Sequence, residues 1–269
     1  MRETAYAKIN LALHVRARLP DGYHRIETIF AFAEAGDVLT AEAGEGLSLE
    51  IVGPFAADLA GEGDNLVLRA ARVLRPDGAA RLTLEKNLPV SAGIGGGSAD
   101  AAAALRLLNR FWKLDFPEET LLPIAATLGA DVPACLLSRN ARGEGKGDAL
   151  APIEIEGLAG LSLLLVNPGT KLSTASVFRA WDGVDRGPLG AWQEGRNDLE
   201  ASARRLVPEI GDVLAALSGA RFARMSGSGA TCFGLYGDEA ARAAAAAAIE
   251  AAHPVWWTLA TRFRSAEAQ

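Results

Sequence analysis

Basic clusters, cysteine frameworks and long apolar runs are all scarce in this 269-residue chain. Lysine and arginine (27 residues) are outnumbered by aspartate and glutamate (33 residues), the net charge is −6, and no basic cluster stands out. Because nucleic-acid binding relies on clustered lysine and arginine that contact phosphates, a nucleic-acid partner is not expected. A small anionic ligand remains compatible with the sequence, since one site can be positive on an acidic protein.

Only two cysteines occur, Cys135 and Cys232, and they lie far apart in the sequence. They form neither a disulfide framework nor a CxxC metal site, so we expect two small apolar side chains in strand-like or buried settings. No stretch approaches 18 apolar residues, and residues 1–6 lack the basic-then-apolar pattern of a signal peptide. These absences predict a cytoplasmic protein that has no membrane partner.

The most informative stretch that is present runs from residue 89 to residue 105 and contains four glycines within five residues. Ser98 and Asp100 follow the glycines as candidate N-caps of an alanine-rich helix. Glycine leaves backbone N–H groups uncovered, and a helix N-terminus adds the positive end of its dipole. We therefore predict a phosphate-binding loop. The glycines are Gly93, Gly95, Gly96 and Gly97.

This loop differs from the best-known glycine motifs. A Walker A loop needs a lysine after the glycines, and a dinucleotide fingerprint needs glycine where Ser98 stands. The G-x-S-x-G pattern of a hydrolase nucleophile is absent at both Ser98 and Ser228. Taken alone, the loop is also compatible with a flexible turn that only caps a helix.

The rest of the N-terminal half predicts alternating strands and helices. Apolar and polar residues alternate over residues 7–16, which indicates a strand with Lys8, Asn10 and His14 on its polar face. Lys8 and Asn10 are compatible with ordinary solvated positions. Further strands are expected over 26–32, within 41–53 and over 81–85, and helices over 64–74, from the glycine loop to about 112, and over 117–128.

Asp131 follows the expected helix end at Gly129, and the neighbouring Val132-Pro133 pair should hold it in an extended conformation. A turn or capping role is the ordinary expectation for one aspartate. The alternative is a rigidly held carboxylate that accepts a proton from a hydroxyl during phosphoryl transfer. The glycine-containing segment 140–148 is predicted to be a loop and the boundary between two domains, 1–152 and 153–269.

The C-terminal half predicts elements in the order β-α-β-β-α-β, a split βαβ arrangement with helices on an antiparallel sheet. The fold class is therefore α+β, built of two-layer sandwiches. The expected elements are strands over 161–166, 221–225, 230–236 and 255–263, and helices over 173–181, over 197–217 with a break at Pro208, and over 238–252.

Three segments, in this order and spacing, resemble the motifs of the GHMP kinase superfamily of small-molecule kinases. They are Ala7–Leu11, Pro89–Ala103 and Met225–Phe233. The resemblance spans nearly the whole chain and implies an N-terminal ribosomal-protein-S5-domain-2-like domain and a C-terminal ferredoxin-like domain. Asp21–His24 and Gly129–Pro133 resemble the branch that phosphorylates the 2-hydroxyl of a CDP-linked methylerythritol in the non-mevalonate isoprenoid pathway.

The resemblance also implies roles for individual residues. Asp131 would be the catalytic base, and Lys8 would orient the hydroxyl beside it. The ATP site would comprise Pro89, Gly93, Ile94, Gly95, Gly96, Gly97, Ser98, Ala99 and Asp100. Mg²⁺ would accompany ATP, bound mostly by phosphate and water. Ile94 and Ala99 replace the leucine and second serine of the common family loop, which removes one hydroxyl, and we expect a modest effect because backbone donors carry most of the binding.

For the cytidine end of the substrate, the resemblance implies stacking of cytosine on Tyr23 and Phe178, with His24 reading the edge of the base. Asn10 and Thr174 would contact the polar part of the substrate, and Gly227 and Gly229 of the third motif would help to shape the cleft. Another GHMP kinase, of homoserine or mevalonate type, is an alternative, and so is a nucleotide-binding protein of this fold without catalysis. The expected protein is a monomer or a homodimer.

Overall fold

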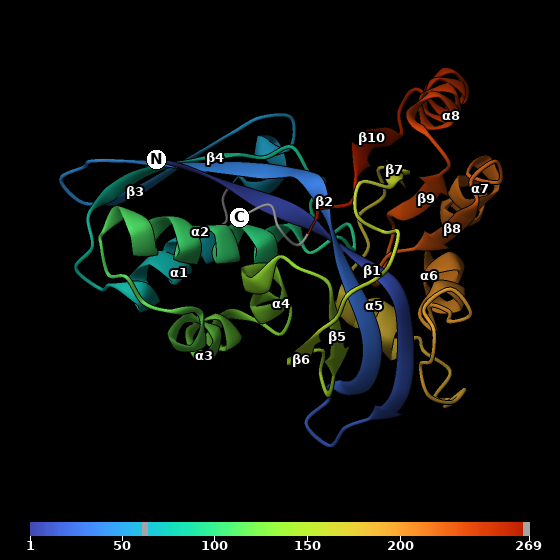
Figure 1. Ribbon diagram of the computed structural model, residues 1–269, viewed down its shortest axis with the longest axis horizontal. Helices are drawn as coiled ribbons and strands as arrows, with labels where there is room; N and C mark the ends of the chain where they lie inside the picture. Colours follow the sequence, from blue (N-terminus) through green and yellow to red (C-terminus); the bar gives the residue numbers. More distant parts are fainter. Residues whose placement is uncertain (61–63, 266–269) are drawn as a thin grey trace. The chain divides into compact units, whose positions relative to one another are not determined.

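The computed structural model describes residues 1–60 and 64–265, and the chain forms two compact units (Figure 1). Two long strands, β1 (Arg2–Arg18) and β2 (His24–Glu42), pair with each other and contribute residues to both units. The first unit contains residues 1–8, 35–90 and 95–138, and the second contains residues 9–34, 91–94 and 139 onward.

These units do not follow the predicted boundary between residues 152 and 153. The strands β1 and β2 are 17 and 19 residues long, and at about 3.3 Å per residue they exceed the width of one small domain. The sequence indicated a much shorter second strand, because the segment Ala33–Asp37 lacks β-branched and aromatic residues. The predicted polar face of the first strand is buried at Lys8, Asn10 and His14.

In the first unit, β4 (Ala80–Glu85) lies between β3 (Leu47–Val52), to which it is parallel, and residues 38–42 of β2, to which it is antiparallel. The side chains of β4 alternate as predicted, with Leu82 and Leu84 buried. Figure 1 shows the helices of this unit on one side of its strands. They are α1 (Leu66–Leu74), α2 (Gly96–Phe111), α3 (Glu118–Leu128) and α4 (Val132–Leu137), and the short helix η1 (Ala56–Leu59) follows β3.

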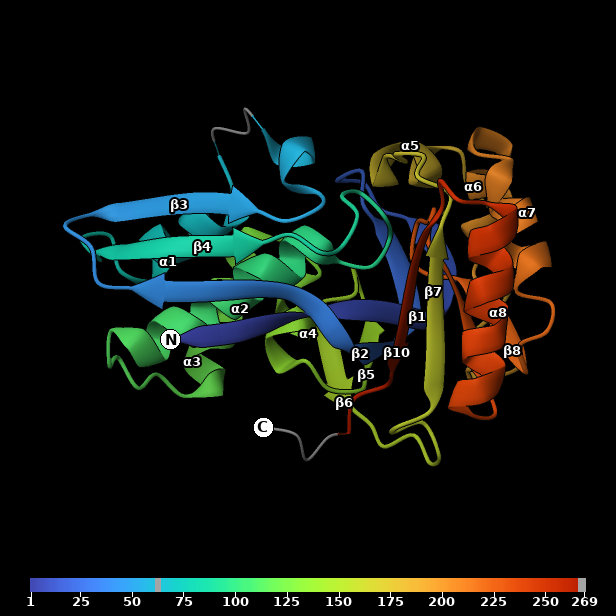
Figure 2. The ribbon, with the colours of Figure 1, turned by 90° about the horizontal axis from the view of Figure 1, so that it is seen from above.

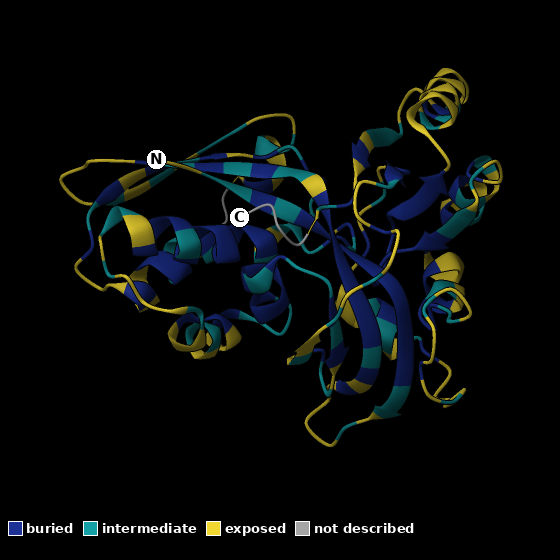
Figure 3. Ribbon diagram, viewed as in Figure 1, coloured by how far each residue is buried: buried dark blue, intermediate teal, exposed yellow. Residues whose placement is uncertain are grey.

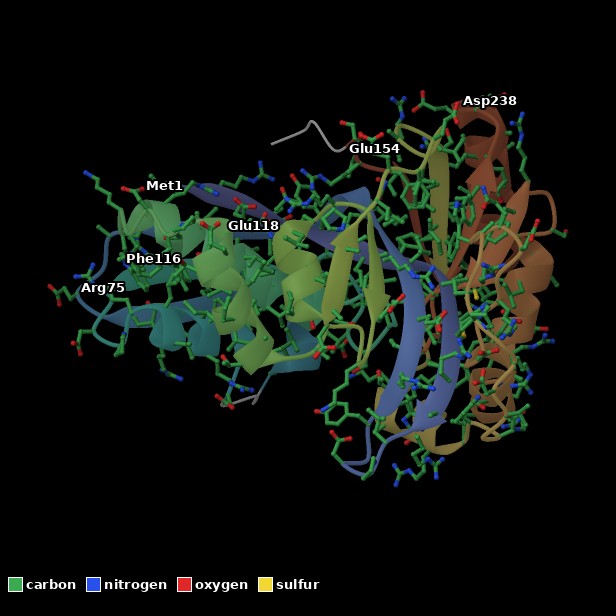
Figure 4. All side chains as sticks on the ribbon, turned by 60° about the horizontal axis from the view of Figure 1, so that its bottom comes forward. Met1, Arg75, Phe116, Glu118, Glu154 and Asp238 are labelled. Carbon is green, nitrogen blue, oxygen red and sulfur yellow. The ribbon has the colours of Figure 1, made fainter. Side chains whose placement is uncertain are left out.

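Side-chain caps and braces fix the ends of these helices. The Oδ1 atom of Asn65 accepts a hydrogen bond from the backbone N–H of Val67 at 2.9 Å, which makes Asn65 the N-cap of α1. Asn109 on α2 bonds both backbone groups of Phe116, at 2.9 and 3.0 Å. Phe116, labelled in Figure 4 with Glu118, thus holds the start of α3 at Glu118 in a position that α2 determines.

The segment around Asp131 differs from the prediction. Asp131 has helical backbone angles (φ −85°, ψ −13°) and is the N-cap of α4, so the expected extended conformation is wrong. Proline is tolerated in the first turn of a helix because its missing N–H would have no intrahelical partner there. Pro133 therefore begins a helix rather than preventing one, and Cys135 lies on that helix.

In the second unit, four strands form an antiparallel sheet in the order β10-β7-β9-β8. With the helices α7 and α8 on one face (Figure 2), this is the predicted β-α-β-β-α-β arrangement, and the α+β class is confirmed. The elements are β7 (Ser162–Asn167), α5 (Thr174–Arg179), α6 (Glu200–Leu206), α7 (Glu209–Ala216), β8 (Phe222–Met225), β9 (Cys232–Tyr236), α8 (Glu239–Ala252) and β10 (Trp257–Arg262).

Burial in this unit follows its layers. All six residues of β7 are buried, whereas α8 buries only Ala246 and Ile249 and is otherwise mostly exposed (Figure 3). The N-cap of α8 is Asp238, labelled in Figure 4, whose Oδ1 accepts from the N–H of Ala241 at 2.8 Å. The predicted break at Pro208 is confirmed, because α6 ends at Leu206 and α7 begins at Glu209.

Residues 140–148 contain a strand where the sequence predicted only a loop. The hairpin of β5 (Ala141–Glu144) and β6 (Ala149–Pro152) pairs through β5 with residues 28–30 of β2. Its three glycines conceal the pattern, because glycine carries no side chain that would show alternation. Among the described residues, no helix is long and apolar enough to cross a membrane.

Candidate active site

The side chains of Lys8 and Asp131 meet within the first unit, although 123 positions separate them in the sequence. The ammonium of Lys8 on β1 donates to Oδ2 of Asp131 at 3.0 Å. Lys8 is buried, whereas the side chain of Asp131 is 38% exposed. Lys8 therefore orients a carboxylate that stays accessible to solvent, as a proton acceptor for a substrate hydroxyl requires.

The helix that carries Asp131 is held from its other end. Arg106 on α2 donates to the carbonyl oxygens of Cys135 and Leu136, at 2.7 and 3.2 Å. The same guanidinium donates to Oε1 of Glu3 on β1 at 2.8 Å. Arg106 thus joins α4, α2 and β1, and it fixes the two elements from which Asp131 and Lys8 come. Nothing in the local sequence around Arg106 indicated this role.

The glycine loop leads directly into α2 in the same unit. Gly95 has a left-handed backbone (φ 68°) and is the N-cap of a helix that begins at Gly96. The prediction that Ser98 or Asp100 caps this helix is wrong, because both lie inside its first turns. A left-handed glycine lets the chain enter the helix without a side-chain cap. Helix geometry leaves the first N–H groups of α2 without intrahelical partners, which is the anion-binding arrangement expected of the loop.

Gly95 of the loop lies against Lys8. A Cβ atom added to Gly95 would lie 3.1 Å from both Cβ and Cε of Lys8, and 3.6 Å from Sγ of Cys135. Any side chain at this position would therefore press on Lys8. The structure brings three of the predicted residues together here, namely Lys8, Asp131 and Gly95, so that the predicted phosphate-binding loop and the candidate base lie side by side.

The remaining residues of the predicted ATP site divide by burial. Gly97 is exposed and Gly93, Gly96 and Ser98 are half-buried, whereas Pro89, Ile94 and Ala99 are buried. Because the methyl group of Ala99 packs inside the fold, a serine hydroxyl at this position would also be buried. The Ala99 departure from the family pattern therefore removes no exposed group.

Asp100 points away from the loop surface. Its carboxylate is buried and its Oδ2 lies 2.7 Å from Nζ of Lys86, which also contacts Asp37. Burial, opposed by Lys86, raises the pKa of Asp100 to about 7. The carboxylate of Asp100 thus belongs to an internal ion cluster rather than to the exposed wall of the ATP site. Sequence reasoning missed Lys86, just after β4, and Asp37, within β2, because one polar residue at either kind of position carries no distinguishing signal.

In the second unit, the third motif packs against the part of the glycine loop that belongs to the same unit. A Cβ atom on Gly93 would lie 2.5 Å from the carbonyl oxygen of Ser226, and one on Gly227 would lie 2.7 Å from the carbonyl oxygen of Gly93. Ser226 accepts from the N–H of Asn10 and donates to the carbonyl of Gly93, both at 3.1 Å. Glycine is required where two backbones approach so closely.

Two side chains outside this motif brace it, namely Asn197, which the sequence did not single out, and Thr174, which it did. Asn197 donates to the carbonyl oxygens of Met225 and Gly227, both at 2.8 Å. The hydroxyls of Thr174 and Ser228 lie 2.8 Å apart, which ties the start of α5 to the motif. Gly229 has a left-handed backbone (φ 81°), which favours glycine at this position as well.

Asn10 is held by a second hydrogen bond. Its Nδ2 donates to Oγ1 of Thr28 at 2.8 Å, and Thr28 donates in turn to the carbonyl of Ala12 at 2.7 Å. This relay leaves Asn10 in a single orientation. Thr28 was not recognised in the sequence, because one threonine in a strand carries no distinguishing signal.

The aromatic cluster of the second unit contains two of the residues predicted to contact cytosine, His24 and Phe178. The ring of His24 lies against Phe178, with centroids 4.8 Å apart, and edge-on to Trp181, with centroids 5.7 Å apart. Burial, and then the charge of Arg18, lower the pKa of His24, so the ring favours its neutral form. A neutral imidazole offers one donor and one acceptor, which suits recognition of a base edge.

Tyr23 lies in a turn and is 55% exposed. The ammonium of Lys146, in the β5–β6 turn, lies 4.4 Å from the centre of its ring and 2.6 Å from Oδ2 of Asp21. Hydrogen bonding to Lys146 lowers the pKa of Asp21, so this ion pair persists at neutral pH. One face of Tyr23 therefore carries a cation, a contact that the spacing of the sequence did not suggest.

Within residues 1–60 and 64–265, no three His, Cys, Asp or Glu side chains gather where they could hold a metal ion. The two cysteines are free and buried, as expected. Burial raises the pKa of both thiols, that of Cys135 to about 12.

Comparisons with known proteins agree with this arrangement of motifs. The family model "GHMP kinases N terminal domain" matches residues 65–139, and "GHMP kinases C terminal" matches residues 184–255. A protein of Rhizorhabdus wittichii named 4-diphosphocytidyl-2-C-methyl-D-erythritol kinase is 57% identical over 97% of this chain and 94% of its own length. A protein of the same name from Novosphingobium aromaticivorans is 52% identical, over 96% of this chain and 91% of its own length.

Solved structures give the same result. A crystal structure of 4-(cytidine 5'-diphospho)-2C-methyl-D-erythritol kinase has a TM-score of 0.83 and 35% identity, and covers 98% of this chain and 100% of that one. Mevalonate kinase of Methanococcus jannaschii has a TM-score of 0.71 at 10% identity, covering 98% of each chain. At that identity the second likeness concerns the fold alone.

Proposed function

This chain belongs to the GHMP kinase family, and we propose that Asp131, Lys8 and the glycine loop carry its reaction. The chain is an ATP-dependent kinase that phosphorylates the 2-hydroxyl of 4-diphosphocytidyl-2-C-methyl-D-erythritol, in the non-mevalonate route to isoprenoids. The observation that supports the residue assignment is the 3.0 Å pair of Lys8 and Asp131 beside Gly95.

In the proposed step, Asp131 accepts the proton of the substrate hydroxyl. The hydroxyl oxygen then bonds to the γ-phosphorus, the bond from that phosphorus to the bridging oxygen breaks, and ADP leaves. Lys8 occupies Oδ2 of Asp131, which leaves Oδ1 to face the substrate. The contribution of this chain is thus a base held in place and a phosphate site next to it, rather than a covalent intermediate.

The triphosphate would bind along residues 93–98, with the N–H groups at the start of α2 as donors. These donors and the helix dipole stabilise negative charge that moves toward the bridging oxygen as the phosphoryl group transfers. Mg²⁺, the metal expected with ATP, would neutralise part of the phosphate charge. The proposed enzyme is cytoplasmic and works as a monomer or homodimer.

The cytidine end is proposed to bind in the second unit, where Tyr23, His24 and Phe178 belong. His24 would read the edge of cytosine, and the rings of Tyr23 and Phe178 would stack on its faces. Thr174 and Asn10, with the backbone of Gly227 and Gly229, would contact the polar part of the substrate. The neutral form that burial favours for His24 supports its role as a base reader.

We expect Tyr23→Ala to weaken binding of the cytidine substrate by roughly 1–3 kcal/mol, the range measured for the stacking of a base on an aromatic ring. The KM for the substrate should rise and the KM for ATP should stay constant, in steady-state kinetics with each substrate varied in turn. Val255→Ala, at another highly exposed apolar position, serves as the control and should change neither constant. An unchanged substrate KM in Tyr23→Ala would show that cytosine does not stack on this ring.

The function is tested by ADP release from Mg²⁺-ATP with one acceptor at a time. We expect turnover with 4-diphosphocytidyl-2-C-methyl-D-erythritol and only background with homoserine, mevalonate or no acceptor. Turnover with one of the other acceptors instead would keep Asp131 as the base and remove the cytosine site. Binding of ATP without release of ADP from any acceptor would favour a protein of this fold without catalysis.

A further inference from the structure

Three charged side chains form a buried cluster in the first unit, beneath the glycine loop. The ammonium of Lys86, which follows β4, contacts Oδ2 of Asp37 on β2 and lies 2.7 Å from Oδ2 of Asp100 on α2. None of the three side chains is more than 5% exposed. Buried charges need a compensating structural or functional reason, because their removal from water is costly. The proposed phosphoryl transfer step uses none of these three side chains.

The cluster holds both ends of the loop. Oδ1 of Asp37 accepts from the N–H groups of Asn87 and Leu88, at 2.6 and 2.8 Å, immediately before the loop begins. At the other end, Asp100 belongs to the helix that the loop enters, and a Cβ atom on Gly96 would lie 3.2 Å from Nζ of Lys86. The position of the first turn of α2 therefore depends on the cluster.

The charges of the cluster do not balance. Two carboxylates share one ammonium, which leaves an excess negative charge beneath a helix N-terminus that is expected to bind phosphate. Both oxygens of Asp37 are engaged, but Oδ1 of Asp100 is buried and has no hydrogen-bond partner among the described residues. An unpartnered carboxylate oxygen in such a place is where a proton can be held.

The other groups around Asp100 do not offset this charge. Burial is the main cause that raises the pKa of Asp100, to about 7. Lys86 opposes this increase, and Asp37 adds to it. The thiol of Cys135 on α4 is within electrostatic range of Asp100, and burial raises the pKa of this thiol to about 12, so it stays uncharged at neutral pH. The state of Asp100 therefore decides whether the cluster is neutral or negative.

We propose that Asp37, Lys86 and Asp100 are positioning residues for ATP, and that Asp100 takes up a proton on Oδ1 when the triphosphate binds. This inference rests on the proposed binding of ATP at the start of α2. A negative cluster repels the phosphates across the first turn of the helix, and a neutral cluster leaves the helix dipole unopposed. Proton uptake then accompanies binding, and affinity falls as the pH rises and Asp100 ionises.

The test is calorimetric titration of the full-length enzyme with ATP and excess Mg²⁺, without acceptor, in buffers of different ionisation enthalpy. We expect the wild type to take up protons near pH 7 when it binds ATP. For Asp100→Asn, whose side chain is neutral and of the same size, we expect no more proton uptake than the free nucleotide itself accounts for. From about pH 6 to about pH 8.5, the ratio of the wild-type Kd to the Asp100→Asn Kd should rise roughly threefold to tenfold. Asp77→Asn, at an exposed position of the same unit, should behave as the wild type.

Each other outcome overturns the inference. Equal proton uptake and equal pH dependence in wild type and Asp100→Asn, with ATP bound by both, would overturn it and leave the proposed function intact. Absence of proton uptake by the wild type near pH 7 would overturn it even if Asp100→Asn did not fold. Absence of ATP binding by both the wild type and Asp77→Asn would overturn the proposed function together with the inference.

Discussion

Asp131→Asn is expected to lower kcat by a factor of roughly 10²–10⁴, the contribution typical of a positioned general base, while the affinity for ATP stays nearly constant. The substitution keeps the size of the side chain and removes its capacity to accept a proton. The phosphates are expected to bind the backbone of the glycine loop, and Asp131 is not part of this loop. The effect should therefore appear in kcat and in kcat/KM equally, the pattern of an interaction made only in the transition state.

A matched control separates chemistry from helix capping, since Asp131 is also the N-cap of α4. Asp238→Asn changes the N-cap of α8 in the same way and should leave kcat unchanged. A double-mutant cycle with Lys8→Met adds a second criterion. If Lys8 acts by orienting Asp131, the double variant should be about as slow as the slower single variant. An Asp131→Asn enzyme with wild-type kcat would remove Asp131 from the role of base.

Lys86→Met is expected to lower the free energy of unfolding by about 3–5 kcal/mol at neutral pH, because breaking a buried ion cluster leaves uncompensated charge. Asp37 and Asp100 would face each other without a cation, in a place that water does not reach. The loss should shrink as the pH falls, since protonation of Asp100, whose pKa burial raises to about 7, removes one of the two unpaired charges. Urea denaturation should show the change as a lower midpoint with an unchanged slope.

Two further variants test the cause of this loss. Lys171→Met, at an exposed position, should leave the midpoint within error of the wild type. The triple variant Asp37→Asn, Lys86→Met, Asp100→Asn should recover most of the stability, because it removes the unpaired charges along with the cation. An unchanged midpoint in Lys86→Met would contradict the burial of this cluster.

Local patterns in the sequence determined most of the elements. The alternation over residues 81–85 and the break at Pro208 are decided by neighbours a few positions away, and the structure agrees with both. The order of strands and helices after residue 160 was sufficient for the α+β class. A local rule failed at Asp131, where an extended conformation was expected. There the packing of the short helix α4 outweighed the preference for an extended backbone before proline.

What only the tertiary structure decided is which distant side chains meet. The pairing of Lys8 with Asp131 and the contact of His24 with Phe178 and Trp181 join residues that no periodicity relates. Lys86 illustrates the physical reason. Its neighbours in the sequence are those of any polar residue at a strand end. Its burial depends on the favourable interaction with two carboxylates, which other elements bring close to it. The sequence by itself determined the glycine loop, the three motifs and their order. Which charged side chains surround the loop was decided only when the chain folded.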